Sequence, residues 1–213
     1  MTFELYLKAK DRTKGPEFRR WLVESFARSS GAALLSVSAE DEDLGELGAV
    51  FPASAAIFDA ILSFGAERAW KAARERPELR DAVEVKIATV AGLVQKAGPP
   101  APVGLRAGAT LVAFITPDPR LTDDEFQRRW RDHTDVLFKV QRGPQEYVQN
   151  LFVAPGAGMA PYRGYARLRY SAIETLGSDM APSYEGADRD GAEDVARFAV
   201  AAEVAMMREY THA

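Results

Sequence analysis

A segment rich in proline and glycine, Lys96–Gly108 (KAGPPAPVGLRAG), lies close to the midpoint of the 213-residue chain. Its three prolines and three glycines interrupt helical and strand patterns alike, because proline removes a backbone donor and glycine favours turns. Such a break predicts a linker, and its central position prompts a search for a repeat. We therefore expect a first unit over residues 1–97, a linker over 98–108 and a second unit over 109–213.

The patterns on the two sides of the linker follow the same order. Alternation of apolar and polar residues predicts strands, and apolar residues spaced three and four apart predict helices. In the first half these patterns fall at residues 3–9 (strand), 15–31 (helix), 32–38 (strand), 45–51 (strand), 54–79 (helix) and 83–90 (strand). In the second half they fall at 109–116 (strand), 122–138 (helix), 146–153 (strand), 162–170 (strand) and 171–179 (start of a helix). The final segment, Val204–His212, is compatible with either a helix or a closing strand.

This order, β-α-β-β-α-β in each half, is that of a ferredoxin-like unit. Such a unit leaves one face of its sheet without helices, and a second sheet must cover that face. The sequence therefore predicts an α+β fold in which tandem ferredoxin-like (βαββαβ) repeats form a pseudo-dimeric α+β barrel, with a cavity between the two sheets.

Charge and composition exclude several classes of function. A net charge of −4 with both signs interspersed gives no broad basic face for nucleic acid. The chain has no cysteine and only two distant histidines, so a metal site with several ligands is not expected. No long apolar run suggests a membrane span or a signal peptide. We expect a cytoplasmic protein with a small-molecule partner; a homodimer is compatible with the sequence.

His133 lies on a predicted amphipathic helix that begins at a T-x-x-E capping box, Thr122–Glu125. Helical periodicity places His133 on the apolar stripe that also contains Phe126, Trp130 and Leu137. One interpretation is a buried imidazole that hydrogen-bonds to the backbone. The other is a general base at the edge of a cavity, because a neutral histidine in an apolar pocket suits proton transfer.

Two predicted strands carry further polar candidates. Arg163, Tyr165 and Arg167 alternate with small or apolar residues, so they face either solvent or the cavity; in the cavity they would suit a carboxylate or an enolate. Tyr6 lies on a matching polar face of the first half. On the strand at 146–153, Tyr147 and Gln149 share one face and Asn150 lies on the other. Tyr147 is interpreted as either a phenolic acid or a core residue.

The second half resembles the EthD family of dimeric α+β-barrel proteins. The resemblance is carried by PDPRLTDDEFQRRWRDHTDVLF, then EYVQN, then YRGYARLRYSAIETL, and it covers roughly Thr110 to Tyr210. It implies the barrel fold, a functional role for His133, and a small catabolic or polyketide enzyme that needs no cofactor. Arg163 and Arg167 stand where the family pattern has acidic residues, which favours an anionic ligand here.

The leading functional hypothesis is a cofactor-independent lyase or isomerase of the decarboxylase, dehydratase or cyclase type. Its substrate would be a small, anionic, aromatic or enolisable catabolic intermediate. His133 would be the base, Tyr165 or Tyr147 the hydrogen-bond donor to an oxyanion, and Arg163 or Arg167 the clamp on the acid group. Substrate contacts are expected from Trp130, Asn150, Gln149 and Tyr6. The alternatives are a non-catalytic binding protein and a heme protein with His133 or His212 as the axial ligand.

Overall fold

The computed structural model describes residues 1–39, 57–141, 143–155, 158–172 and 176–212. The described strands are β1 (Thr2–Ala9), β2 (Leu34–Ser38), β3 (Ala60–Phe64), β4 (Val83–Lys96), β5 (Gly104–Leu105), β6 (Ala109–Pro117), β7 (Glu146–Pro155), β8 (Gly164–Tyr170) and β9 (Ala199–Thr211). The described helices are α1 (Gly15–Trp21), α2 (Ala27–Ser30), α4 (Glu67–Arg74), α5 (Pro77–Ala82), α6 (Asp123–Val140), α7 (Leu176–Asp179) and α8 (Ala187–Val195). A π-helical turn (Leu22–Phe26) joins α1 to α2, and a 3-10 turn (Arg12–Lys14) precedes α1.

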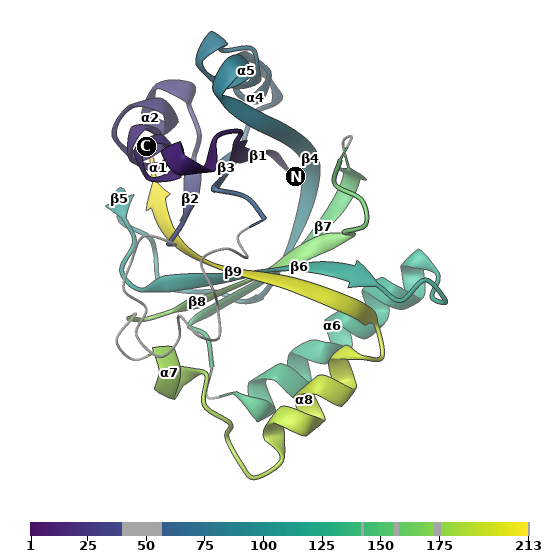
Figure 1. Ribbon diagram of the computed structural model, residues 1–213. Coiled ribbons are helices and arrows are strands. Elements are labelled where there is room, and N and C mark those ends of the chain that lie inside the picture. The colour runs from purple at the N-terminus through teal and green to yellow at the C-terminus, as the bar shows by residue number, and fades with distance from the viewer. Residues whose placement is uncertain (40–56, 142, 156–157, 173–175, 213) are drawn as a thin grey trace.

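The strands form one closed antiparallel barrel (Figure 1). Eight of them follow the order β2-β3-β1-β4-β7-β8-β6-β9, and β9 then pairs with β2, from Leu34 opposite Thr211 to Ser38 opposite Met207. The short β5 pairs with the end of β9. Because the ring closes, none of the eight long strands leaves a free hydrogen-bonding edge.

The expected fold, tandem ferredoxin-like repeats forming a pseudo-dimeric α+β barrel, is wrong. The strands do not divide into two sheets that face each other across a cavity. Strand β4 of the first half pairs with β7 of the second, and β9 pairs with β2, so both halves belong to a single eight-stranded sheet. The register of β4 against β7 shifts at Thr89/Val90 and at Val94/Lys96. Such bulges increase local twist and bending and so help a long strand to follow a barrel wall.

Two sequence-based assignments of secondary structure are resolved by the structure. The helix expected over 54–79 is wrong for Ala60–Phe64, which is the fully buried strand β3, whereas α4 and the start of α5 lie in its later part. Residues 54–56 of that prediction lie outside the described residues. The segment Val204–His212, left open by the sequence, belongs to strand β9 up to Thr211. The strand expected at 45–51 lies outside the described residues.

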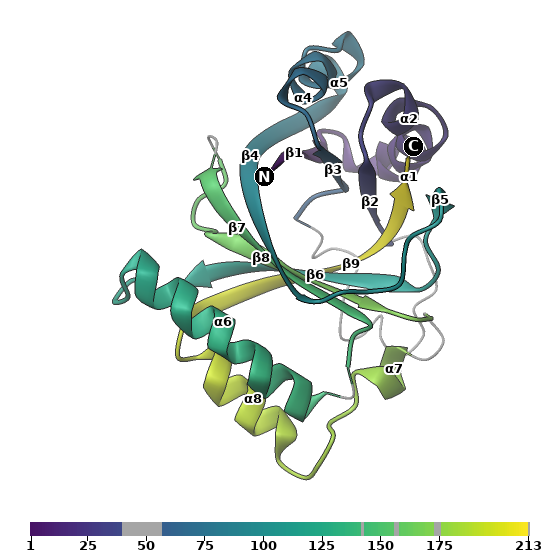
Figure 2. The ribbon, with the colours of Figure 1, turned by 180° about the vertical axis from the view of Figure 1, so that it is seen from behind.

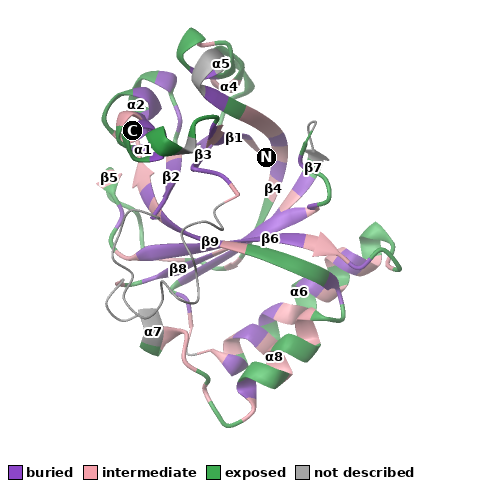
Figure 3. Cartoon of the chain, viewed as in Figure 1, coloured by how far each residue is buried: buried purple, intermediate pink, exposed green. Residues whose placement is uncertain are grey.

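Helices cover the barrel on two opposite sides (Figures 1 and 2). Helices α1, α2, α4 and α5 lie beside the strands of the first half, and α6 and α8 lie beside those of the second. Each side buries its own apolar cluster, the first around Leu22, Phe26 and Leu62, the second around Trp130 and Leu168. Figure 3 shows that the strands are the most buried part of the chain. None of the described helices has the length and apolarity needed to cross a lipid bilayer.

Aromatic side chains pack together inside the barrel. Among them are Tyr6, Phe58, Phe114, Phe152 and Tyr165. Tyr6 contacts the other four, with ring centroids 5.2 to 6.3 Å apart. Edge-on contacts at these distances add to the stabilisation that comes from burial alone.

Buried ion pairs join the linker to the barrel. Arg106 follows β5, and its guanidinium donates to Glu209 of β9 and to Glu146 of β7, each at 2.8 Å. Arg167 of β8 also donates to Glu146. All four side chains are at least 80% buried: the Arg106, Glu146, Arg167 and Glu209 side chains are 8%, 10%, 17% and 1% exposed.

Replacing Arg106 by methionine is expected to destabilise the fold. The substitution keeps an unbranched apolar stem but leaves Glu146 and Glu209 buried with one partner fewer, and breaking such a pair costs about 3–5 kcal/mol. Urea unfolding followed by circular dichroism measures the change. The control Arg128→Met removes an exposed pair with Asp132 on α6 and should leave the unfolding free energy close to that of wild type. Equal midpoints for the two variants would contradict the proposed role of Arg106.

Candidate functional site

Helix α6 is fixed at its start by the expected capping box. The Thr122 hydroxyl accepts from the backbone N–H of Glu125 (3.3 Å), and the Glu125 carboxylate accepts from the backbone N–H of Thr122 (3.1 Å). From there the helix lays Phe126, Trp130 and Leu137 against the outer face of the barrel, where all three are buried. Gly164 of β8 allows this approach, since a Cβ there would lie 3.0 Å from the Trp130 ring and 2.3 Å from a backbone oxygen.

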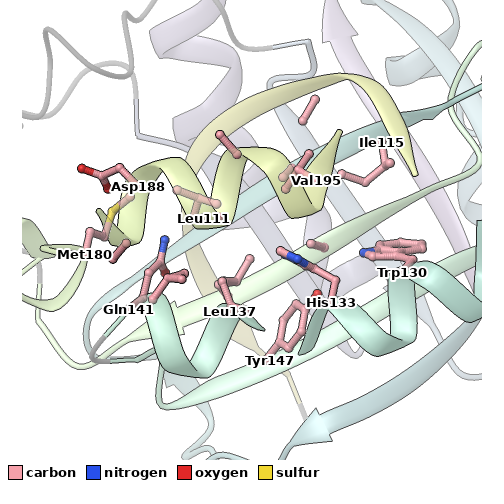
Figure 4. A pocket seen from close by; sticks show the side chains of 18 of the residues that line it. Leu111, Ile115, Trp130, His133, Leu137, Gln141, Tyr147, Met180, Asp188 and Val195 are labelled. Atoms are coloured by element: carbon pink, nitrogen blue, oxygen red, sulfur yellow. The ribbon is translucent and has the colours of Figure 1, made fainter. Parts of the chain in front are cut away.

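A pocket of about 280 Å³ lies between α6, α8 and the outer face of the sheet (Figure 4). Its volume lies just below the usual range for small-molecule sites, about 300–1,000 Å³. Most of the wall is apolar. Large apolar side chains in it are Leu111, Ile115, Leu137, Leu168, Val195 and Phe198. The polar side chains are His133, Gln141, Asp188, Trp130 and the two tyrosines Tyr147 and Tyr170.

His133 forms a histidine–aspartate pair at this pocket. Its Nδ1 lies 2.8 Å from Oδ2 of Asp194 on α8, and its ring packs against Phe198 with centroids 5.2 Å apart. The His133 and Asp194 side chains are 11% and 13% exposed. Asp194 also lies 3.3 Å from Arg197 through its other oxygen. Among the described residues Nε2 has no hydrogen-bond partner, so it is the nitrogen left for a ligand.

The electrostatics of the pair favour a neutral imidazole. Burial lowers the pKa of His133 below its ordinary 6.5, and the nearby Asp194 opposes that shift only in part. A carboxylate at Nδ1 holds the proton on that nitrogen and leaves Nε2 with a free lone pair, as in the histidine of hydrolase triads. The pair is therefore equipped to accept a proton near neutral pH.

Tyr147 and Gln149 lie together under α6. Gln149 donates to the Tyr147 hydroxyl (3.0 Å) and to the backbone oxygen of Trp130 (2.6 Å), while Gln95 donates to Gln149 (2.8 Å). Burial raises the pKa of Tyr147 to about 12, so the phenol stays protonated at neutral pH. Tyr147 lines the pocket and Gln149 holds it in place.

The remaining candidates lie elsewhere. Tyr165 donates to the carboxylate of Glu4 inside the barrel (2.8 Å), and Tyr6 donates to the same group. Arg167 is also internal, paired with Glu146. Arg163 pairs with Asp123 at the start of α6, and both side chains are partly exposed there.

Asn150 is buried and points away from Gln149, as strand alternation requires. The structure therefore brings together His133, Trp130 and Tyr147, with Gln149 directly behind them. It separates Tyr6, Tyr165, Arg163, Arg167 and Asn150 from the pocket.

Sequence reasoning missed Asp194, Gln141 and Asp188. Asp194 is 61 residues from His133, and its helical segment was not separated from the strand that follows it. In the sequence around Asp194 the only visible feature is a helix rich in acidic residues, and that feature is typical of any helix exposed to solvent. The described residues contain no group of three or more His, Asp or Glu side chains arranged to hold a metal ion.

Comparisons with known proteins support the barrel fold. No known family matches the chain, and no curated protein resembles its sequence. A "putative monooxygenase" from Lactobacillus acidophilus NCFM aligns with a TM-score of 0.52 and 9% identity, over 99% of this chain and 95% of that one. An anthrone oxidase-like protein aligns with a TM-score of 0.58 and 10% identity, over 99% of this chain and 92% of that one.

A "putative monooxygenase" from Fusobacterium nucleatum aligns with a TM-score of 0.53 and 10% identity, over 99% of this chain and 92% of that one. At such low identity the likeness shows the fold alone. The resemblance of the second half to the EthD family is not confirmed by any of these comparisons.

The titration of His133 provides a direct test of the pair. We expect NMR to give a pKa below 6.5, and a still lower value in Asp194→Asn, because the carboxylate that favours the charged form is lost. His212→Asn assigns the signals, since the chain has two histidines. As the pH falls, the unfolded chain binds a proton at His133 before the folded chain does, because the folded pKa is lower. The free energy of unfolding that neutral His133 contributes is therefore fully present above about pH 6.5 and is lost as the pH falls through the folded pKa. A pKa above 6.5 in the wild type would contradict this assignment.

Proposed function

We propose that this protein is a small-molecule-processing enzyme in which His133 is the general base. The observation that most supports this proposal is the His133–Asp194 pair on the wall of a largely apolar pocket. Proton transfer by a positioned histidine contributes about 10²–10⁴-fold to a rate. The reaction class is that of a cofactor-independent lyase or isomerase acting on an enolisable compound.

In the proposed step, Nε2 of His133 removes a proton from a carbon next to a carbonyl group. Asp194 stabilises the imidazolium ion that forms, since its Oδ2 already lies 2.8 Å from Nδ1. The phenol of Tyr147 lines the same pocket and is protonated at neutral pH, and in this proposal it donates to the developing enolate oxygen. Return of the proton to another carbon completes an isomerisation.

The arginine clamp of the initial hypothesis has no part in this proposal. Arg167 lies on the other side of the sheet and Arg163 lies beside the start of α6, and neither lines the pocket. Tyr165 donates its hydrogen bond to Glu4 inside the barrel, so it too is absent from the pocket. The oxyanion donor in the proposal is therefore Tyr147, and Trp130 supplies an aromatic wall.

Oxygenation without a cofactor is a second candidate, favoured by the names of the structural neighbours. It would share the first step. The carbanion left after proton removal reduces O₂, a hydroperoxide forms at that carbon, and loss of water gives a carbonyl group. O₂ is the oxidant, and its second oxygen atom leaves as water.

Hydrogen–deuterium exchange tests the base without knowledge of the natural substrate. In D₂O, wild type is expected to accelerate exchange at the activated carbon of β-tetralone, a neutral bicyclic ketone, as followed by NMR. His133→Ala should lower kcat/KM for exchange by about 10²–10⁴-fold. The rate should fall as the pH drops through a pKa below 6.5, because only neutral His133 accepts a proton.

Asp135→Asn, an exposed change on the same helix, is the control and should behave as wild type. Exchange that is equal in His133→Ala and wild type would remove His133 as the base. Binding of the ketone without any exchange would favour a non-catalytic binding protein.

Oxygen uptake with anthrone separates the two candidate reactions. If the protein oxygenates carbanions, one O₂ should be consumed for each quinone formed, and His133→Ala should abolish both. An oxygen electrode and the quinone absorbance give the two quantities. Deuterium exchange into anthrone with no enzyme-dependent oxygen uptake would exclude oxygenation and leave the lyase or isomerase class.

A further inference from the structure

The pocket has a second polar end, formed by Gln141. This residue lies directly after α6, eight positions beyond His133, which corresponds to about 12 Å along the helix axis. Figure 4 shows the His133, Leu137 and Gln141 side chains following one another along the side of α6 that faces α8. The pocket therefore has a base at one end, an amide at the other and an apolar stretch between them.

The amide of Gln141 is fixed by its neighbours. The Tyr170 hydroxyl donates to its Oε1 at 3.2 Å, and its backbone forms a bridge with Pro182. Its backbone N–H donates to Leu137 (3.0 Å). Oε1 already accepts from Tyr170, whereas Nε2 has no partner among the described residues, so the unused donor that Gln141 offers a ligand is an N–H group.

The charges around the pocket disfavour anions. No lysine or arginine is among the described residues that line it, whereas Asp188 does line it. Asp194, which lies against His133, is itself paired with Arg197 and adds no cationic group to the wall. A carboxylate ligand would lose water in an apolar pocket without a cationic partner, and that transfer is costly. A neutral ligand avoids this penalty.

From these observations we infer that Gln141 determines specificity for neutral, elongated ligands that carry a hydrogen-bond acceptor at the end remote from the acidic proton. The Nε2 of Gln141 donates to that acceptor, while the proton to be removed lies at His133. Anionic ligands are rejected. This inference rests on the proposed function in taking this pocket as the substrate site, and it replaces the anionic substrate expected from the sequence.

Three matched probes test the inference by fluorescence titration, independently of turnover. They are a hydroxynaphthyl methyl ketone with its two groups on opposite rings, the corresponding hydroxynaphthoate, and naphthol, which lacks the acceptor. The wild type should bind the ketone at least about tenfold more tightly than the carboxylate, because a desolvated charge costs more than one hydrogen bond contributes.

Gln141→Leu should weaken ketone binding by about tenfold, the value of one hydrogen bond, and leave naphthol binding unchanged. Gln127→Leu makes the same change on α6 at a position that does not line the pocket, and it should bind all three probes as wild type does. A second variant, Gln141→Glu, tests the same end if the leucine variant unfolds. It should reject the carboxylate still more strongly, because its own charge repels the ligand.

Three results would overturn the inference: a carboxylate that binds wild type as tightly as the ketone, an affinity for the ketone relative to naphthol that is unchanged in both Gln141 variants, or no binding of any probe. None of these results bears on the proposed role of His133 as the base. Loss of the preference for the ketone over naphthol together with His133-dependent exchange on β-tetralone supports both proposals. Exchange that does not depend on His133, with the Gln141 effects intact, would reject the proposed chemistry and keep Gln141 as a ligand-binding residue.

Discussion

The pairing of β9 with both β6 and β2 is the constraint on which the rest of the structure depends. Its first part pairs with β6, from Ala199 opposite Pro117 to Met207 opposite Thr110, and its last part pairs with β2. This single strand therefore joins the second half of the barrel to the first and closes the ring. Closure fixes the strand register, because a shift by one residue would exchange every inward side chain with an outward one.

The same alternation divides the chemistry of the protein between two compartments. On β8, Tyr165 and Arg167 point into the barrel, whereas Ala166 and Leu168 face α6 and α8. In the internal compartment the Glu4 carboxylate accepts from Tyr6, from Tyr165 (2.8 Å) and from Ser63 (3.0 Å). Burial raises the pKa of Glu4, but these hydroxyl donors and Arg167 oppose that shift. These internal polar residues hold the barrel together, and the pocket outside it is left for ligands.

Much of the local structure could be predicted from the sequence, but not the way its two halves join. The capping box of α6 and the apolar stripe that contains His133 are local patterns, and both are present in the structure. Strand β3 was mistaken for a helix because a short, mostly apolar run such as Ala60–Phe64 fits either period. The pairings of β4 with β7 and of β9 with β2 join residues far apart in the chain, and single-sequence periodicity contains no information on them.

The position of the pocket follows from the sizes of side chains, which periodicity does not weigh. Alternation predicts that both helix-covered faces of the barrel are apolar, and on that basis the cavity was expected inside the barrel. On the first face, large residues such as Leu22, Phe26 and Leu62 meet under the helices. A pocket on that side opens beside α1, at Phe18 and Trp21, among charged side chains. On the second face, small residues line the pocket: Ala113, Ala166, Ala187, Gly191, Ala192 and Ala202. Two helices packed over small residues leave a void between the larger ones. A histidine on the stripe therefore borders an opening here, whereas the same spacing over larger residues would have buried it in a solid core.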